Sequence, residues 1–254
     1  MVMVKTELIK KEINEYIKTP KGIILLAVFV FFALSSPLMG RYMNEIIATV
    51  APDIVFDFPE PSLVDGWGQV FKNFSSICII VFLILMTGTV SQEKSKGSIL
   101  LVLTKKVSRF EFILSKFLVG SLAFTILFIG SSFISAWYIN SLFGSYIYDG
   151  LFMSLLLFWL MGIFFTALAV FVSVIGKTPT TSALMGFAGY GILQILNISI
   201  DLSLFNPSGA PAIVNEIMKG TIQMSEMWKP IVVSILAVGF FFSAAQYFFK
   251  RQEI

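Results

Sequence analysis

Hydrophobic residues in this chain gather into six long runs, and every charged residue lies between these runs or at the chain ends. Each run is close to the roughly 20 residues that a helix needs to cross about 30 Å of hydrocarbon. Because a helix satisfies its own backbone hydrogen bonds, an uncharged run can span a bilayer without exposing polar groups to lipid. The pattern predicts six membrane-spanning helices, at residues 22–40, 74–91, 117–139, 151–175, 181–200 and 230–249.

The segment before the first run has a helical period of its own. Between residues 4 and 18, Lys, Glu and Asn alternate with an apolar set at i, i+4 spacing that consists of Val4, Leu8, Ile9, Ile13, Tyr16 and Ile17. This pattern is typical of an amphipathic helix on a membrane surface, and an ordinary solvated helix is the alternative. Residues 1–21 are therefore predicted to form a cytoplasmic interfacial helix, which Thr19 and Pro20 end.

Basic residues are distributed unevenly between the two sides of the predicted membrane. With the N-terminus inside, fourteen of the eighteen Lys and Arg residues fall in inner segments. Positive charge near the spans marks the cytoplasmic side, so both termini are predicted to be cytoplasmic in a multi-pass protein of the cell (plasma) membrane. Residues 41–73 and 201–229 then form extracellular loops. We expect a short helix on each side of the Pro-Glu-Pro turn at 59–61 and an amphipathic stretch at 212–218.

Composition narrows the class further. With 57% hydrophobic and 13% charged residues and a mean hydropathy of +0.88, the chain reads as one all-α integral membrane domain. There is no His, and Cys78 is the only Cys, which excludes intrachain disulfides, Cys/His metal sites and imidazole catalysis. Gly176-Lys177-Thr178 resembles the end of a phosphate-binding loop, but Phe171 occupies the position of the required first Gly. We expect no catalytic residue, no metal and no cofactor.

Polar residues inside the runs are few and uncharged. Most of them, such as Ser131 and Thr166, are expected to hydrogen-bond neighbouring helices and to contribute on the order of 1 kcal/mol each. Gln194 and Asn197 are the candidates for lining a transport pathway. A purely structural role is the equal alternative for these two residues.

The segment 91–116 differs from the other connections because it holds six of the eighteen basic residues. Its apolar stretch at 97–103 is too short to cross a bilayer and too apolar for a solvated loop, so we expect it to dock on another surface. Ser108 and Glu111 match a capping box, and Val107 and Phe112 match a hydrophobic staple. A new helix is therefore predicted to begin at Ser108 and to lead into the membrane.

Residues 92–99 (QEKSKGSI) and 107–116 (VSRFEFILSK) resemble the connection between the second and third spans of type-2 ABC transporter permeases. The positions that match this family's motif are Glu93, Gly97, Ser98, Ser108 and Arg109. The family often has Pro where this chain has Lys106, so the turn geometry departs from the family pattern there. The resemblance also covers the surface helix, the six spans and the position of both termini.

The resemblance implies that this connection carries a coupling helix that docks on a separate cytoplasmic ATPase subunit. The residues expected to take part are Glu93, Lys94, Gly97, Ser98, Ile99, Leu100, Leu103, Ser108 and Arg109. Ile99, Leu100 and Leu103 would fill an apolar groove on the partner, while Glu93, Lys94 and Arg109 would pair at its polar rim. The alternative is a segment that lies on anionic lipid through its Lys residues.

The function implied by the resemblance is that of the permease subunit of an ABC exporter. Such a chain is not an enzyme, because ATP is hydrolysed on the partner, and it works with two ATPase copies and a second, identical or different, permease chain. An amphipathic peptide, a drug or an ion would be the substrate, and no nucleic acid partner is expected. Two other functions stay open, namely an immunity or resistance protein that sequesters a toxic peptide and an ATP-independent channel.

Overall fold

A computed structural model of the chain describes residues 6–50, 59–99 and 107–252. Within these residues the chain forms helices joined by turns, and no β-strand occurs. Six helical stretches in this part are long and apolar enough to cross a membrane: Pro20–Val50, Leu63–Ser95, Arg109–Phe143, Leu151–Ile175, Pro179–Ile198 and Met224–Arg251. The predicted all-helical class and the predicted number of spans are thereby confirmed.

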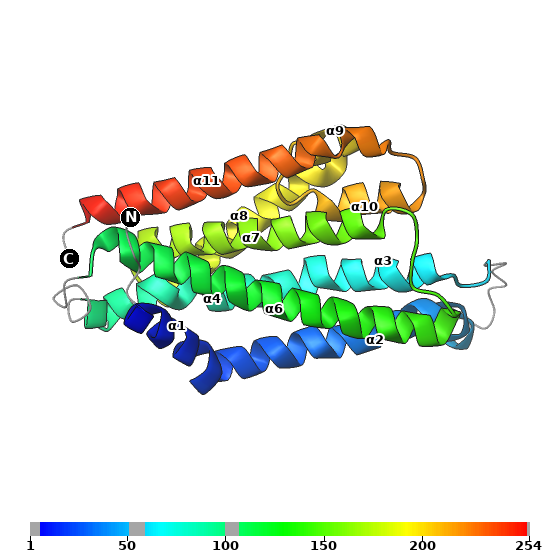
Figure 1. Cartoon of the computed structure of the whole chain (residues 1–254), viewed down its shortest axis with the longest axis horizontal. Helices are drawn as coiled ribbons and strands as arrows, with labels where there is room; N and C mark the ends of the chain where they lie inside the picture. The colour runs from blue at the N-terminus through cyan, green and yellow to red at the C-terminus, as the bar shows by residue number, and fades with distance from the viewer. Residues whose placement is uncertain (1–5, 51–58, 100–106, 253–254) are drawn as a thin grey trace.

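Most of the long helices run along one axis, and α1 lies at an angle to it (Figure 1). The helices are α1 (Thr6–Lys18), α2 (Pro20–Val50), α3 (Leu63–Asn73), α4 (Ile79–Ser95), α6 (Arg109–Phe143), α7 (Leu151–Ile175), α8 (Pro179–Ile195) and α11 (Trp228–Arg251), with the short α9 (Ile200–Leu204) and α10 (Ala210–Met218). One end of the bundle, which we call proximal, contains the start of α1 and the end of α11, and the end of α2 lies at the opposite, distal end (Figure 1).

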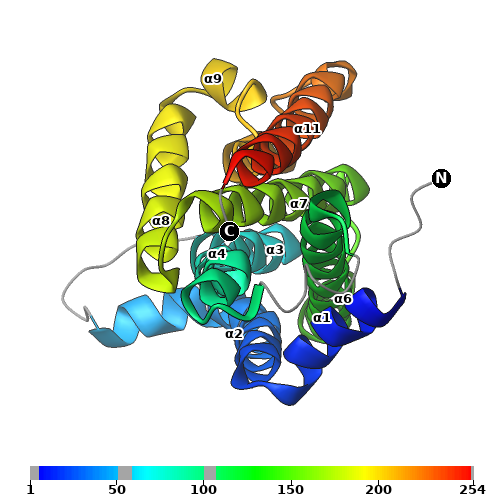
Figure 2. The same cartoon turned by 90° about the vertical axis from the view of Figure 1, so that its left-hand side faces the viewer.

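The centre of the bundle is α7, which contacts α4, α6, α8 and α11 (Figure 2). A helix enclosed by neighbours must be apolar all round, and 72% of the most apolar stretch of α7 is buried. Its Gly162 lies directly under the ring of Phe124 on α6, where an added Cβ would come within 1.9 Å of a ring carbon. The absence of a side chain at Gly162 therefore sets how closely α6 and α7 approach.

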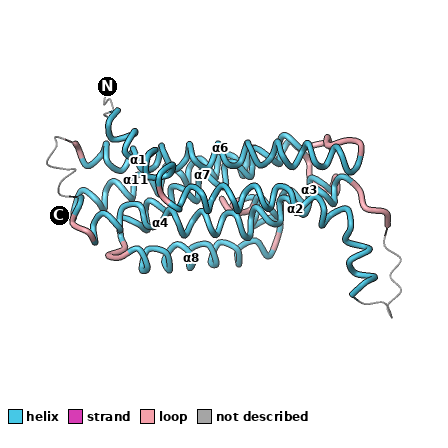
Figure 3. The backbone as a smooth tube through the Cα atoms, turned by 90° about the horizontal axis from the view of Figure 1, so that it is seen from below, coloured by secondary structure: helices cyan, strands magenta, loops and turns pink. Residues whose placement is uncertain are grey.

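The long helix α2 continues through an internal proline, Pro37. Proline has no backbone N–H, so the carbonyl four residues earlier loses its helical partner. That carbonyl, of Ala33, accepts a hydrogen bond from the Ser135 hydroxyl of α6 at 3.1 Å. The distal end of α2 bends away from its neighbours, and α8 runs along the outside of the bundle (Figure 3).

The N-terminal helix α1 packs against α2 and α6. Leu8 and Glu12 are buried on the side that faces the bundle, whereas Ile17 is 69% exposed. The apolar period predicted this helix, but its buried side also contains a carboxylate. The position of α1 at a membrane interface stays a prediction.

The helices extend beyond the predicted runs because charged residues are accommodated on the ends of long helices, outside the apolar stretch. The predicted loop at 41–73 holds the last turns of α2 and all of α3. A π-helical turn, Phe74–Cys78, joins α3 to α4, so the predicted second run is the proximal part of one longer stretch. Lys72, expected in a loop, lies on a helix instead. In the other predicted loop, residues 212–218 fall within α10 as expected.

Candidate functional site

The predicted coupling segment, residues 91–116, begins within the last turns of α4, which ends at Ser95. The backbone N–H of Gly97 donates to the Lys94 carbonyl at 3.1 Å, and Gly97 has a φ of +68°. That left-handed conformation suits glycine and is a common way to end a helix. Gly97 thus turns the chain out of α4 at the proximal end of the bundle.

Within residues 91–116, Ser108 is the N-cap of α6. The Glu111 backbone N–H donates to the Ser108 hydroxyl at 3.1 Å, and the Ser108 backbone N–H donates to the Glu111 carboxylate at 2.8 Å. This reciprocal pair is the predicted capping box. Leu100 and Leu103 lie outside the described residues.

Ile99 is 2% exposed and belongs to a small apolar cluster at the proximal end. The cluster joins α4, α6, α7 and α11 through side chains that include Phe112 and Phe249, whose rings stack with centroids 5.5 Å apart. Ile99 was expected to enter a groove on the ATPase. Its side chain instead packs within this chain.

Three charged residues expected at a polar rim form bonds within the chain. The Lys94 ammonium donates to the carbonyls of Val174 at 2.7 Å and Gly176 at 3.3 Å, which holds the end of α4 against the end of α7. Arg109 donates through one guanidinium nitrogen to three carbonyls at the end of α11, at 2.8 to 3.0 Å. A cation at a helix C-terminus satisfies carbonyls that lack helical partners. The third residue, Glu93, enters a buried cluster.

Four charged side chains meet between α1, α4 and α6, and we call Lys11, Glu12, Glu93 and Lys116 the ionic cluster. The Lys116 side chain is fully buried, and its ammonium lies 2.8 Å from a Glu12 oxygen and in contact with Glu93. Lys11 lies 2.6 Å from the same Glu93 oxygen. Two positive and two negative groups balance, which a buried ion requires because an uncompensated charge is costly away from water.

A further carboxylate stands beside this cluster. Glu15 forms an ion pair with Lys21 at 2.7 Å. Burial raises the pKa of Glu15, but the charge of Lys116 and the bond from Lys21 lower it by more, so this pKa lies below its usual range. The carboxylates of Glu12, Glu15 and Glu93 come within 4.8 Å of one another. The Lys116 ammonium contacts two of these three carboxylates, those of Glu12 and Glu93.

Of the two candidate pathway residues, Gln194 lies in the last turn of α8, and Asn197 lies in the 3₁₀ turn Leu196–Ile198 that follows. Asn197 donates to the Ser208 carbonyl at 3.0 Å and accepts from Asn206 at 2.8 Å. The Gln194 side-chain oxygen accepts from Asn197 at 3.2 Å. These bonds connect α8 to the turn before α10. A role in the pathway stays a prediction.

Comparison with known proteins identifies the family of this chain. The family model described as ABC-2 family transporter protein matches residues 6–253. The chain belongs to the ABC-2 transporter family. It is also 26% identical over 215 residues to an uncharacterized transmembrane protein, YxlG, of Bacillus subtilis (strain 168), and the alignment covers 84% of this chain and 81% of that protein.

As a member of the ABC-2 family, the chain is a multi-pass membrane permease of an ABC transporter, which is a transport subunit. Permeases of this family generally work with a cytoplasmic ATPase and dimerise. The chain leaves α4 at Gly97 and enters α6 after Ser108, and both residues match the motif of the resemblance. Side chains from four helices of this ABC-2 permease converge with Ile99 in the apolar cluster beside Gly97.

Sequence reasoning missed the ionic cluster, because Lys11, Glu12 and Lys116 were counted as surface charges. One signal was present in the sequence. Glu12 stands four residues after Leu8 and four before Tyr16, so it shares the apolar side of α1. Lys116 likewise stands four residues after Phe112. Charges in register with an apolar stripe are candidates for buried pairs.

Proposed function

We propose that this ABC-2 permease is energised by a cytoplasmic ATPase subunit that docks on residues 91–116, with both chain termini on the cytoplasmic side. The observation that supports the proposal is the way in which the chain leaves α4 at Gly97, with a left-handed conformation, and enters α6 through the Ser108 capping box. The segment between them is flanked by bonds to the ends of α7 and α11 and to α1. A partner that moves the segment would therefore act on several helices at once.

The proposed coupling role has two parts. Gly97 and Ser98 set the direction in which the chain leaves α4, and Leu100 and Leu103 would contact the ATPase. Glu93, Lys94, Ser108 and Arg109 hold the flanks of the segment to the helices. In this assignment the charged residues transmit the motion, and the apolar residues of the segment receive it.

Transport requires a route that this chain completes with a second permease chain, identical or different. The most apolar stretches of the fifth and sixth spans, Pro179–Ile198 and Met224–Arg251, are each only 11% buried. A single copy therefore leaves large apolar faces for lipid or for that second chain. We propose export of an amphipathic peptide, drug or ion, with Gln194 and Asn197 as pathway candidates and two ATPase copies per complex.

Gly97 and Gly220 provide a matched test of the docking proposal. Both have a φ of +68°, and an added Cβ would meet nothing within 4 Å at either position. Gly97→Val and Gly220→Val therefore introduce similar backbone strain at the coupling segment and at a turn after α10. We expect an ATPase subunit to copurify with the wild type and with Gly220→Val, and Gly97→Val to lose it.

The experiment extracts the C-terminally tagged chain from its native membrane in mild detergent. Size-exclusion chromatography checks that each variant elutes as the wild type does. Equal ATPase recovery with both variants would refute the role of residues 91–116. A wild-type chain that stays folded and carries no ATPase in several mild detergents would refute the energising proposal itself.

A further inference from the structure

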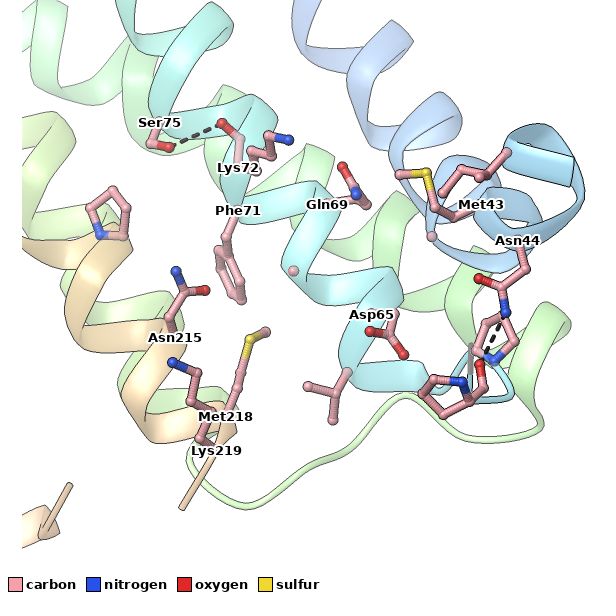
Figure 4. A pocket seen from close by; sticks show the side chains of 17 residues that line it. Met43, Asn44, Asp65, Gln69, Phe71, Lys72, Ser75, Asn215, Met218 and Lys219 are labelled. Carbon is pink, nitrogen blue, oxygen red and sulfur yellow. Dashed lines mark hydrogen bonds between the residues drawn. The ribbon is translucent and has the colours of Figure 1, made fainter. Parts of the chain in front are cut away.

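A groove of about 570 Å³ opens in the distal half of the bundle. Its floor is the exposed side of α3, with Val64, Gly68 and Lys72, and its walls come from α2 and α10 (Figure 4). Pro59 and Pro61 line one end. This volume falls within the range of about 300 to 1,000 Å³ that is typical of small-molecule sites.

Apolar side chains come from all three helices of the groove. Met43 and Ile47 project from α2, Phe71 from α3 and Met218 from α10, and Phe71 points toward α10 (Figure 4). Flexible Met side chains adapt to irregular apolar shapes. The groove is therefore suited to the hydrocarbon part of a ligand.

Several polar side chains of the groove already have partners. One Asp65 oxygen accepts two hydrogen bonds from the capping box at the start of α3, at 2.7 and 2.8 Å. Lys219 forms an ion pair with Glu216 at 2.8 Å, and Asn44 donates to the carbonyl of a proline at the end of the groove at 3.0 Å. These groups have little remaining capacity to select a ligand.

Lys72 is different, because its ammonium has no hydrogen-bond or ion-pair partner among residues 6–50, 59–99 and 107–252. Lys72 and Gln69 extend from α3 on the side that faces α2 (Figure 4). Lys72 lies in the last turn of α3, two residues before the apolar run at 74–91, and its side chain is exposed. The groove therefore presents one available cation above an apolar lining.

We propose that this groove binds an amphiphile with an anionic headgroup. The Lys72 ammonium pairs with a phosphate or carboxylate, the Gln69 amide donates a second hydrogen bond, and the hydrocarbon chain lies against Met43, Phe71 and Met218. A membrane phospholipid and a soluble single-chain amphiphile share this chemistry. Binding requires no ATPase, so it can be measured on the purified permease alone.

Gly68 supplies a second, independent way to disturb the site. Gly68 lines the groove, and an added Cβ there meets no atom within 4 Å, so the side chain of Gly68→Leu starts in open space. It fills the space above the floor of the groove while Lys72 keeps its charge. A loss of binding in this variant would show that the groove, and not charge alone, holds the ligand.

The first measurement titrates octyl phosphate into the full-length chain in nonionic detergent and counts adducts by native mass spectrometry. We expect Lys72→Gln to weaken binding about tenfold, as removal of a charged hydrogen-bonding partner does, and Gly68→Leu to abolish it. Lys72→Arg should retain binding. Lys229→Gln is the matched control, because it removes an equal charge from a lysine that lies outside the groove and pairs with Glu226 at 2.9 Å, and it should bind as the wild type does. Octyltrimethylammonium, of equal chain length, should not bind.

The second measurement reconstitutes the chain in nanodiscs of phosphatidylglycerol mixed with phosphatidylcholine. The protein is then released from the nanodisc, and the lipid that stays bound to it is identified. Retention of phosphatidylglycerol that depends on Lys72 and Gly68 would support the proposal with a phospholipid as the source. Octyl phosphate binding with the same dependence, without lipid retention, would support it with a soluble amphiphile. If neither ligand responds to Lys72→Gln or Gly68→Leu, or if the cationic amphiphile binds equally well, the proposal is overturned.

Discussion

Replacing Lys116 by Met tests the ionic cluster directly. The Lys116 side chain is fully buried, and the Glu12 and Glu93 side chains beside it are 3% and 11% exposed. Removing one partner of a buried ion pair costs about 3 to 5 kcal/mol, because the other charge stays buried and uncompensated. Lys11 remains 2.6 Å from Glu93 and 3.4 Å from Glu12, so we expect a loss near the lower limit, about 3 kcal/mol.

The assay measures the free energy of unfolding in mixed micelles by circular dichroism at increasing SDS mole fraction. Lys11→Met is the control, since the Lys11 side chain is 43% exposed and an exposed pair contributes about 0 to 1 kcal/mol. A triple variant, Glu12→Leu with Glu93→Leu and Lys116→Met, removes the buried charges together. It should be close to the wild type in stability or exceed it, because replacing a whole buried pair by apolar side chains is often neutral or stabilising.

The order of these variants in free energy of unfolding tests whether Lys116 is buried among carboxylates. If Lys116→Met costs no more than Lys11→Met, Lys116 is not buried among carboxylates in the folded protein. If the triple variant is less stable than Lys116→Met alone, the remaining carboxylates are not the source of the loss. Either result would refute the reasoning, whatever the function of the chain.

Three further predictions follow from other contacts. Gly162→Ala should destabilise the chain by about 1 to 3 kcal/mol through a clash with a ring of α6, whereas Gly191→Ala on α8, where an added Cβ meets nothing within 4 Å, should stabilise it by about 0.5 to 1 kcal/mol in the same unfolding assay. Ser135→Ala should cost about 1 to 3 kcal/mol, because the Ala33 carbonyl would be left without a partner, and Ser135→Thr should retain most of the stability. Because the pKa of Glu15 is lower in the folded chain than its usual 4.5, its stabilisation is present above that pH and is lost as the pH falls through the lowered value. The difference in melting temperature between the wild type and Glu15→Gln should therefore shrink on acidification from pH 7, and a constant difference would contradict the ion pair.

Local patterns in the sequence predicted most of the fold. Uncharged apolar runs predicted the six spans, since each run is a property of consecutive residues. The start of α6 followed from Ser108 and Glu111, which meet across three positions. The extent of the helices was underestimated, because Arg41 and Lys72 were taken as loop residues. Charge marks the edge of an apolar run and does not by itself end a helix.

Contacts between distant segments could not be predicted from the sequence. The bond between Lys11 and Glu93 joins residues 82 positions apart, and Arg109 reaches carbonyls of α11 about 140 positions away. A helical wheel shows which residues share a side of a helix, but it does not show which helix faces that side. The same limit applies to Lys72, whose lack of a partner within the described part of the chain depends on how α2 and α10 flank α3.

The kind of contact at the coupling segment bears on how motion would pass from an ATPase to the spans. Apolar surfaces can slide over one another at small cost, because the hydrophobic effect has no preferred direction. Hydrogen bonds and ion pairs weaken steeply when distance or angle changes. The flanks of residues 91–116 are held to α1, α7 and α11 by directional bonds, whereas α7 meets its neighbours mainly through apolar side chains. A displacement of the segment would therefore be passed to the proximal helix ends, while the apolar interior permits the spans to slide. Arg109→Gln, which removes the bonds to α11, should then uncouple ATP hydrolysis from transport without releasing the ATPase, and unchanged coupling in proteoliposomes would contradict this route.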